Sequence, residues 1–252
     1  MTTLRRADRR PALAALVIGA SALAAVTLAA AWPSRPSSGL WFWMLACALS
    51  EYLWVRLPVG RATLSMSSCF NLAALLVLPR GEAMLAVAVS VAVGEAGFMH
   101  KPAVRVAFNS AQTALAVAAG SLVFAALGGS PGGLDGTSGG LGAMVARLDL
   151  APLAAAALAY SVVNTGAVSL AVSLSEGVSP WRAWRENFGN GFELTARGAL
   201  LSLGVLVGID YALAGPAGTL LAALPLVVAH QAYARRLGRL ADERRDETER
   251  AA

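Results

Sequence analysis

Residues 150–174 run LAPLAAAALAYSVVNTGAVSLAVSL, a stretch without a charged side chain. A helix needs about 20 consecutive apolar residues to cross the hydrocarbon core of a bilayer. A run of this kind must be helical there, because every backbone polar group has to find its partner within the segment. Residues 150–174 therefore predict a transmembrane helix.

Seven further apolar runs flank this one and extend the same pattern along the chain. They are Leu13–Ala31, Leu40–Val55, Met66–Leu78, Ala83–Phe98, Val106–Leu127, Thr195–Leu213 and Gly218–Ala234. Together with 150–174 they predict an all-α, polytopic bundle of about eight crossings. Met66–Leu78 is short for a crossing, so a re-entrant third segment, and with it six or seven crossings, is the alternative.

The composition agrees with a membrane protein. Hydrophobic residues make up 57% of the 252 and charged residues 14%, against about 45–50% and about 25% in an average soluble domain. A water-soluble fold is excluded on this ground. The net charge is +5, but the bases are confined to short stretches, so we expect no nucleic-acid partner. Two cysteines provide neither a disulfide framework nor a zinc pattern.

Most basic residues lie in every second connecting segment along the chain. With the N-terminus in the cytoplasm, 17 of the 20 fall in cytoplasmic segments, and only Arg35, Arg80 and Arg147 fall outside. The positive-inside rule then places both termini in the cytoplasm. We expect a multi-pass protein of the bacterial inner membrane, with a basic N-terminus (1–11), a transmembrane domain (12–234) and a charged C-terminal helix or tail (235–252). A cleaved secretory signal is the alternative for the first run, although about 7–15 apolar residues are typical of signals and this run is longer.

Two connecting segments have distinct compositions. The outer segment 128–142 is rich in glycine but has no lysine, so it predicts a flexible connector and not a phosphate-binding loop. The inner segment 175–193 predicts a short amphipathic helix. Its aromatic residues Trp181 and Trp184 and its bases Arg182 and Arg185 suit an interfacial anchor at the lipid headgroups; a docking site is the alternative.

The C-terminal segment continues the last run without a break. Leu226, His230, Tyr233, Leu237 and Leu240 follow alternating spacings of four and three, which is the heptad pattern of a coiled coil. This pattern predicts a coupling helix, represented by Tyr233, Leu237 and Leu240, that extends into the cytoplasm and pairs with a second copy in a homodimer. The alternative is a frayed and solvated charged tail.

Polar residues within the apolar runs are the candidates for function, because the membrane makes them costly. We expect a polar pocket that faces the cytoplasm, formed by Glu51, Glu95, Asn109, Gln112 and Asn164. Snorkelling, salt bridges to nearby arginines and interhelical packing are the alternatives. The sequence offers no Ser–His–Asp, H-E-x-x-H or Cys–His constellation. We therefore expect no enzymatic activity, no cofactor and no metal.

Three stretches together carry a family resemblance. They are AVRVAFNSAQ (103–112), SVVNTGAVSLAVSLSEG (161–177) with WRAWRENF (181–188), and the ending at 224–234 with the charged helix that follows it. Over about 40–245 the chain resembles the membrane-embedded N-terminal sensor region of bacterial signalling proteins with HD-GYP or GGDEF enzymes. The sequence has neither a GGDEF string nor a His-Asp dipeptide, so the resemblance implies sensing without catalysis. Asn109, Gln112 and Asn164 are its matching motif positions.

These observations predict one function and leave a second open. We expect a membrane protein of the sensor type, which passes a signal from the bilayer or a ligand to a cytoplasmic effector protein through the C-terminal helix. The alternative is a small-solute transporter, or the membrane-embedded substrate-binding subunit of one. Glu51 and Glu95, as carboxylates in or near the bilayer, motivate this alternative.

Overall fold

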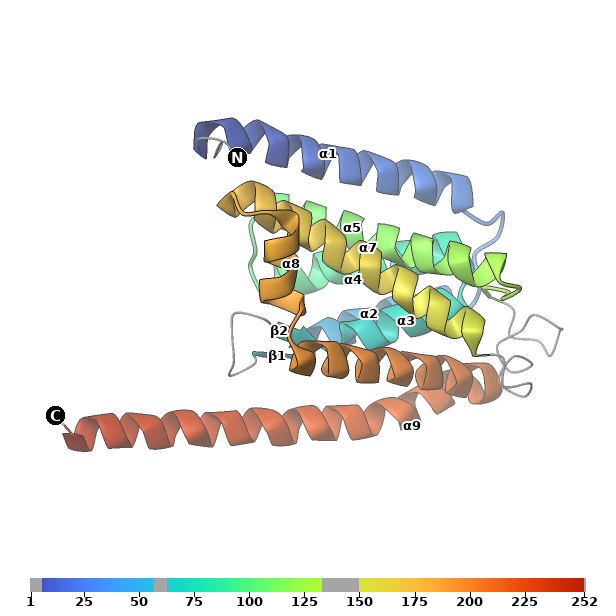
Figure 1. The fold of residues 1–252 in the computed structure, drawn as a ribbon. Coiled ribbons are helices and arrows are strands. Elements are labelled where there is room, and N and C mark those ends of the chain that lie inside the picture. The colour runs from blue at the N-terminus through green and yellow to red at the C-terminus, as the bar shows by residue number, and fades with distance from the viewer. Residues whose placement is uncertain (1–5, 57–62, 133–149, 252) are drawn as a thin grey trace.

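The computed structural model describes residues 6–56, 63–132 and 150–251, and this part of the chain is almost entirely helical (Figure 1). The elements in order are α1 (Arg6–Ala31), α2 (Leu40–Tyr52), β1 (Trp54–Arg56), β2 (Thr63–Ser65), α3 (Ser67–Val77), α4 (Arg80–Val93), the π-helix η1 (Gly94–Phe98), α5 (Ala103–Ala126), α7 (Ala151–Glu176), α8 (Pro180–Phe188) and α9 (Gly191–Ala251).

Five helices are long and apolar enough to cross a bilayer: α1, α4 together with η1, α5, α7, and α9 as far as Pro225. The chain is thus a helical protein of the kind that spans membranes. The shorter helices α2 and α3 have 13 and 11 residues, and at 1.5 Å per residue α3 is only about 17 Å long. The expected eight crossings therefore remain a prediction, with α2, α3 and the expected run Gly218–Ala234 in α9 as the undecided segments.

Several helices begin or end at other residues than the expected apolar runs do. The run Leu40–Val55 does not stay helical to its end, because α2 stops at Tyr52 and Trp54–Arg56 pairs antiparallel with Thr63–Ser65. Helix α4 begins at Arg80, earlier than the expected Ala83, and its last residues widen into the π-helix η1. Three-residue strands are too short for hydropathy alternation to reveal them.

The chain reverses within α9 at Gly215. This residue has φ 63° and ψ −151°, a left-handed conformation that favours glycine, and Pro216 follows it. The break falls between the expected runs Thr195–Leu213 and Gly218–Ala234. Figure 1 shows the second part of α9 running back beside the first part and then past the end of the bundle.

The helices define two ends of the bundle. At one end, called the hairpin end, lie β1, β2, η1 and α8 together with both ends of the described chain (Figure 1). At the other end, called the loop end, Ser37 bonds to Glu82 and Gly132 packs on Pro79. Arg35 and Arg80 are thus at the loop end, whereas Lys101, Arg105 and the bases of α8 are at the hairpin end. These described bases are thus divided between the two ends of the bundle as expected, whereas Arg147 lies outside the described residues and the side of the membrane stays a prediction.

The core of the bundle is built around α3. Every residue from Cys69 to Val77 is buried, because α2, α4, α5 and α9 all pack on this helix. Small residues permit the close approach: a Cβ on Gly204 of α9 would lie 2.6 Å from the carbonyl oxygen of Cys69. Small residues are typical of helix contacts in membranes, where lipid gives no hydrophobic drive for association. The enclosed position of α3 explains how so short a helix can be so apolar.

Candidate functional site

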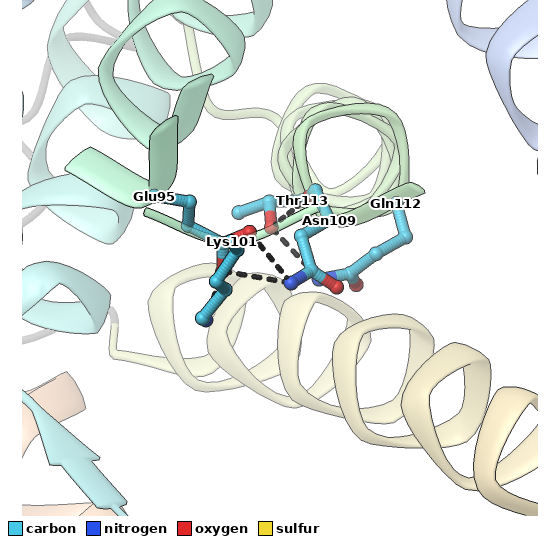
Figure 2. Close-up of polar contacts among 5 residues, drawn as sticks. All are labelled: Glu95, Lys101, Asn109, Gln112 and Thr113. Atoms are coloured by element: carbon cyan, nitrogen blue, oxygen red, sulfur yellow. Dashed lines mark hydrogen bonds and ion pairs between the residues drawn. The ribbon is translucent and has the colours of Figure 1, made fainter. Parts of the chain in front are cut away.

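A polar cluster lies at the hairpin end, where η1 meets α5 (Figure 2). Its centre is the carboxylate of Glu95, a residue only 6% exposed. Lys101 Nζ lies 2.6 Å from Oε1 of Glu95, and Asn109 Nδ2 donates to Oε1 and Oε2 at 2.7 and 2.8 Å. The buried negative charge is therefore compensated by a cation and by hydrogen bonds, as a stable buried carboxylate requires.

Two further side chains of α5 extend the cluster. The hydroxyl of Thr113 donates to the backbone carbonyl of Asn109 at 2.7 Å and accepts from Gln112 Nε2 at 2.8 Å. Since the Thr113 proton is already committed, the Gln112 side chain must present its NH₂ group to Thr113. Five residues, Glu95, Lys101, Asn109, Gln112 and Thr113, thus form one connected polar cluster (Figure 2).

The local backbone brings Glu95 to this place. The π-helix shifts the end of α4 out of the α-helical register, and His100 after it has a positive φ of 50°. The backbone N–H of Lys101 then donates to the carbonyl of Glu95 at 2.9 Å, which turns the lysine side chain back to the carboxylate. Single π-helical turns often occur at functional sites.

Glu51 lies next to the cluster on the neighbouring helix α2. Its side chain packs on Gly94, where a Cβ would lie 2.6 Å from the Cβ of Glu51. Glu51 is 6% exposed, and the Ser67 hydroxyl hydrogen-bonds to its carboxyl group. The rings of Tyr52 and Phe98 pack edge to face beside Glu51 and Gly94, with their centroids 5.6 Å apart. Two carboxyl groups from different helices are therefore buried side by side at the hairpin end.

The expected pocket is thus assembled only in part. The structure joins Glu95, Asn109 and Gln112 and places Glu51 beside them. Asn164 is half-buried on α7, and among the described residues its side chain has no hydrogen bond to the cluster. In the core it is Tyr160 of α7, 1% exposed, that accepts a hydrogen bond of 3.4 Å from Asn71 of α3.

The loop end holds a buried carboxylate that the sequence analysis did not consider. Glu82 in the first turn of α4 is fully buried, and both its oxygens accept hydrogen bonds from Ser37, from the backbone N–H at 2.8 Å and from the hydroxyl. A carboxylate is favoured at the positive N-terminus of a helix. Glu82 lies just before the expected run Ala83–Phe98, so it was not among the polar residues within the apolar runs. The sequence feature that points to it is an acidic residue two positions after Arg80.

The expected amphipathic helix is present as α8. Ser179 caps its N-terminus, and Trp184 Nε1 donates to Thr165 of α7 at 3.2 Å. Trp181 is exposed and stacks on Trp184. Arg182 pairs with Glu186 at 2.7 Å, and this hydrogen bond raises the pKa of Arg182; Arg185 is exposed. Attachment of α8 to headgroups remains a prediction.

The expected coupling helix is the last part of α9. Its backbone is helical to Ala251, so the frayed tail is not what the structure shows. The side chains of Tyr233, Leu237 and Leu240 lie outside the described part of the structure, and the heptad contact therefore stays a prediction. Before that segment, Thr219 is buried and Ala222 and Ala223 pack on the core. One face of this helix is therefore joined to the bundle.

The described residues contain no group of three or more His, Cys, Asp and Glu side chains that could hold a metal ion. Cys47 and Cys69 are free thiols buried in the core. The polar cluster thus contains one buried carboxylate, that of Glu95, whose charge is compensated by Lys101. The lysine side chain is 33% exposed and connects the carboxylate to the surface.

Fold and site together define the protein as a helical membrane protein with a buried polar cluster at one end. Comparison with known proteins finds no matching family model, no matching curated protein and no matching solved structure. The resemblance to the sensor regions of signalling proteins therefore rests on the sequence motifs alone.

Proposed function

We propose that the protein is a sensor-type signalling protein of the bacterial inner membrane, which transmits a change in helix packing to a cytoplasmic partner through the second part of α9. The observation that carries the proposal is the unbroken helix from Pro216 to Ala251, which is packed on the core at Thr219 and extends beyond the bundle (Figure 1). A helix with one end in the core and the other outside it transmits rigid-body movement.

The position of the polar cluster supports this proposal. The C-terminal helix emerges at the hairpin end, where Glu95 and Glu51 are buried. Polar contacts that join η1 to α5 can be made or broken as a unit, because Asn109 holds both oxygens of Glu95. A signal that opens this contact would change the packing of the bundle at the end from which the helix leaves.

Positive charge at the hairpin end supports the cytoplasmic placement of the C-terminal helix. Lys101, Arg105 and the bases of α8 lie there, whereas Arg35 and Arg80 lie at the loop end. Cytoplasmic segments carry the excess of basic residues in membrane proteins. The C-terminal helix would then meet its effector, or a second copy of the chain, in the cytoplasm.

The test measures pairing of the C-terminal helix and its dependence on the cluster. Leu237→Cys in native membranes is expected to form an intermolecular disulfide faster than the off-seam control Arg236→Cys. Glu95→Gln is expected to change this rate at least about fivefold, the lower end of a coupling free energy of about 1–3 kcal/mol. Asn164→Ala, outside the cluster, is the matched control. Equal rates in the Glu95→Gln and parent proteins would contradict the proposal.

A truncation tests the partner separately. Removal of Tyr233–Ala252 is expected to abolish the interaction with the effector and to leave membrane insertion intact, because the described core contacts of α9 at Thr219, Ala222 and Ala223 lie before this segment. An unchanged set of interacting proteins in membranes that contain the truncated chain would count against the C-terminal helix as the coupling element.

Ion-coupled transport of a small solute is the second candidate function, favoured by the two neighbouring buried carboxyl groups of Glu51 and Glu95. Acidic residues inside membrane proteins often mark ion and proton pathways. Proteoliposomes loaded with a pH-sensitive dye would show proton flux under an imposed potential, and Glu51→Ala would lower it. Flat traces for both the parent and the variant would remove this function.

A further inference from the structure

An apolar crevice lies between α1, α5 and α7. Its volume is about 350 Å³, within the range of about 300–1,000 Å³ typical of ligand sites. Ten of its lining residues are apolar or glycine and one, Gln112, is polar; the largest of the apolar ones are Leu16, Leu23, Phe108, Leu115 and Leu170. None of the lining residues is charged, so the crevice suits a hydrocarbon chain and not a polar solute.

The wall formed by α1 leaves room and access for such a chain. A Cβ on Gly19 would meet nothing within 4 Å, so this glycine faces open space. In the most apolar part of α1 only 6% of the residues are buried, and Ile18 and Val26 are 68% and 66% exposed. This helix therefore borders the lipid phase along most of its length. An apolar space of this kind stays dry.

Positive charge lies at the hairpin end of the crevice. Arg105 is exposed and lies seven residues before Gln112, hence on the same face of α5. Among the described residues its guanidinium has no ion-pair partner. Arg10 in the first turns of α1 is exposed as well. Glu176 at the end of α7 is exposed too. The described side chains at these ends of α1, α5 and α7 thus include two exposed arginines and one exposed acid.

We propose that the crevice binds one acyl chain of an anionic phospholipid, from the leaflet at the hairpin end. The acyl chain lies between Leu16, Phe108 and Leu170, and the phosphate group lies at Arg105 and Arg10. Arginine is well suited to phosphate, because its planar fork of donors matches the phosphate oxygens. Anionic lipids are further attracted by about 1 kcal/mol for each base near the surface.

The site goes beyond the proposed function and stands without it, because lipid binding is measured whether or not the protein signals. It also touches the polar cluster at one residue. Gln112 lines the crevice and donates to Thr113, which is bonded to Asn109. The crevice is therefore linked to the polar cluster through Gln112, Thr113 and the backbone carbonyl of Asn109.

The test uses the full chain in phosphatidylcholine nanodiscs that contain a small fraction of a photoreactive lipid. Phosphatidylglycerol and phosphatidylcholine, each with a diazirine midway along one acyl chain, are the two probes. After illumination, mass spectrometry is expected to find the phosphatidylglycerol probe on peptides of α1, α5 and α7, in excess over the phosphatidylcholine probe.

Two substitutions separate the chain site from the phosphate site. Gly19→Leu fills the crevice and is expected to abolish labelling by both probes; Gly198→Leu, also at a glycine with open space around it, is the matched control. Arg105→Gln is expected to lower labelling by the anionic probe about fivefold, the factor for about 1 kcal/mol, and to leave the neutral probe unchanged. Arg35→Gln at the loop end is its control.

Equal labelling by the two probes, or labelling that Gly19→Leu leaves unchanged, would overturn the proposal. Labelling spread evenly over all lipid-facing helices would overturn it as well, because it would show only the surrounding lipid. Arg105 is exposed, so Arg105→Gln leaves the packing intact and keeps the test decisive even if Gly19→Leu does not fold.

Discussion

The substitution Asn109→Ala removes both amide hydrogen bonds to the buried carboxylate of Glu95. Hydrogen bonds to charged groups contribute about 1.5–3 kcal/mol, whereas interhelical hydrogen bonds measured in a membrane protein average about 0.6 and reach about 1.7 kcal/mol. The hydrogen bonds from Asn109 to Glu95 are charge-assisted, short and interhelical. Their contribution to the free energy of unfolding should therefore lie where the two ranges meet. We expect Asn109→Ala to lower the free energy of unfolding by about 1.5 kcal/mol.

Equilibrium unfolding in mixed micelles, followed by tryptophan fluorescence, measures this change. Asn164→Ala is the control and is expected to cost at most about 0.5 kcal/mol. In a Glu95→Gln background the cost of Asn109→Ala should fall clearly below its value in the parent protein, because the charge that the amide satisfies is gone. A loss no greater than that of Asn164→Ala, or the same loss in both backgrounds, would refute the reasoning.

Three further substitutions test the packing and the connections. Gly204→Ala brings a Cβ against the backbone of α3 and should lower the free energy of unfolding by about 1–3 kcal/mol. Gly198→Ala, at a glycine with nothing within 4 Å of an added Cβ, should be tolerated. Equal unfolding curves for the two variants would contradict the packing of α9 on α3. Gly215→Ala forces a positive φ on alanine and should cost about 1–3 kcal/mol, with an unchanged melting temperature as the opposing result. Trp184→Phe loses the bond to Thr165 and should speed proteolysis around α8; an unchanged digestion pattern would argue against this attachment.

The sequence predicted the long helices well, because a bilayer demands uninterrupted apolar stretches. It also located the reversal between Leu213 and Gly218, since Gly215 and Pro216 interrupt the apolar pattern there. The hairpin at Trp54–Arg56 was not predictable in this way, because strands of three residues have no usable periodicity. The π-helix η1 was likewise not predicted from the sequence.

For the site, the sequence identified most of the polar residues but not how they pair. Glu95 and Asn109 were found because polar groups in apolar runs are unusual, whereas Lys101 and Thr113 gave no such signal. The contact of Asn71 with Tyr160 joins residues 89 positions apart, and no single-sequence pattern reports such a pairing. Asn164, an amide in mid-helix, was singled out by the same reasoning; no described hydrogen bond joins it to the cluster, and its role stays a prediction.

The membrane topology is the foundation of these proposals, and reporter fusions test it most directly. Fusions after residues 60, 101, 178 and 252 should give fluorescent cytoplasmic green fluorescent protein and no phosphatase activity. Fusions after residues 38 and 137 should give active alkaline phosphatase outside the cytoplasm. This pattern is what eight crossings with both termini inside would produce. Phosphatase activity at residue 252, or active phosphatase after residue 60, would contradict it.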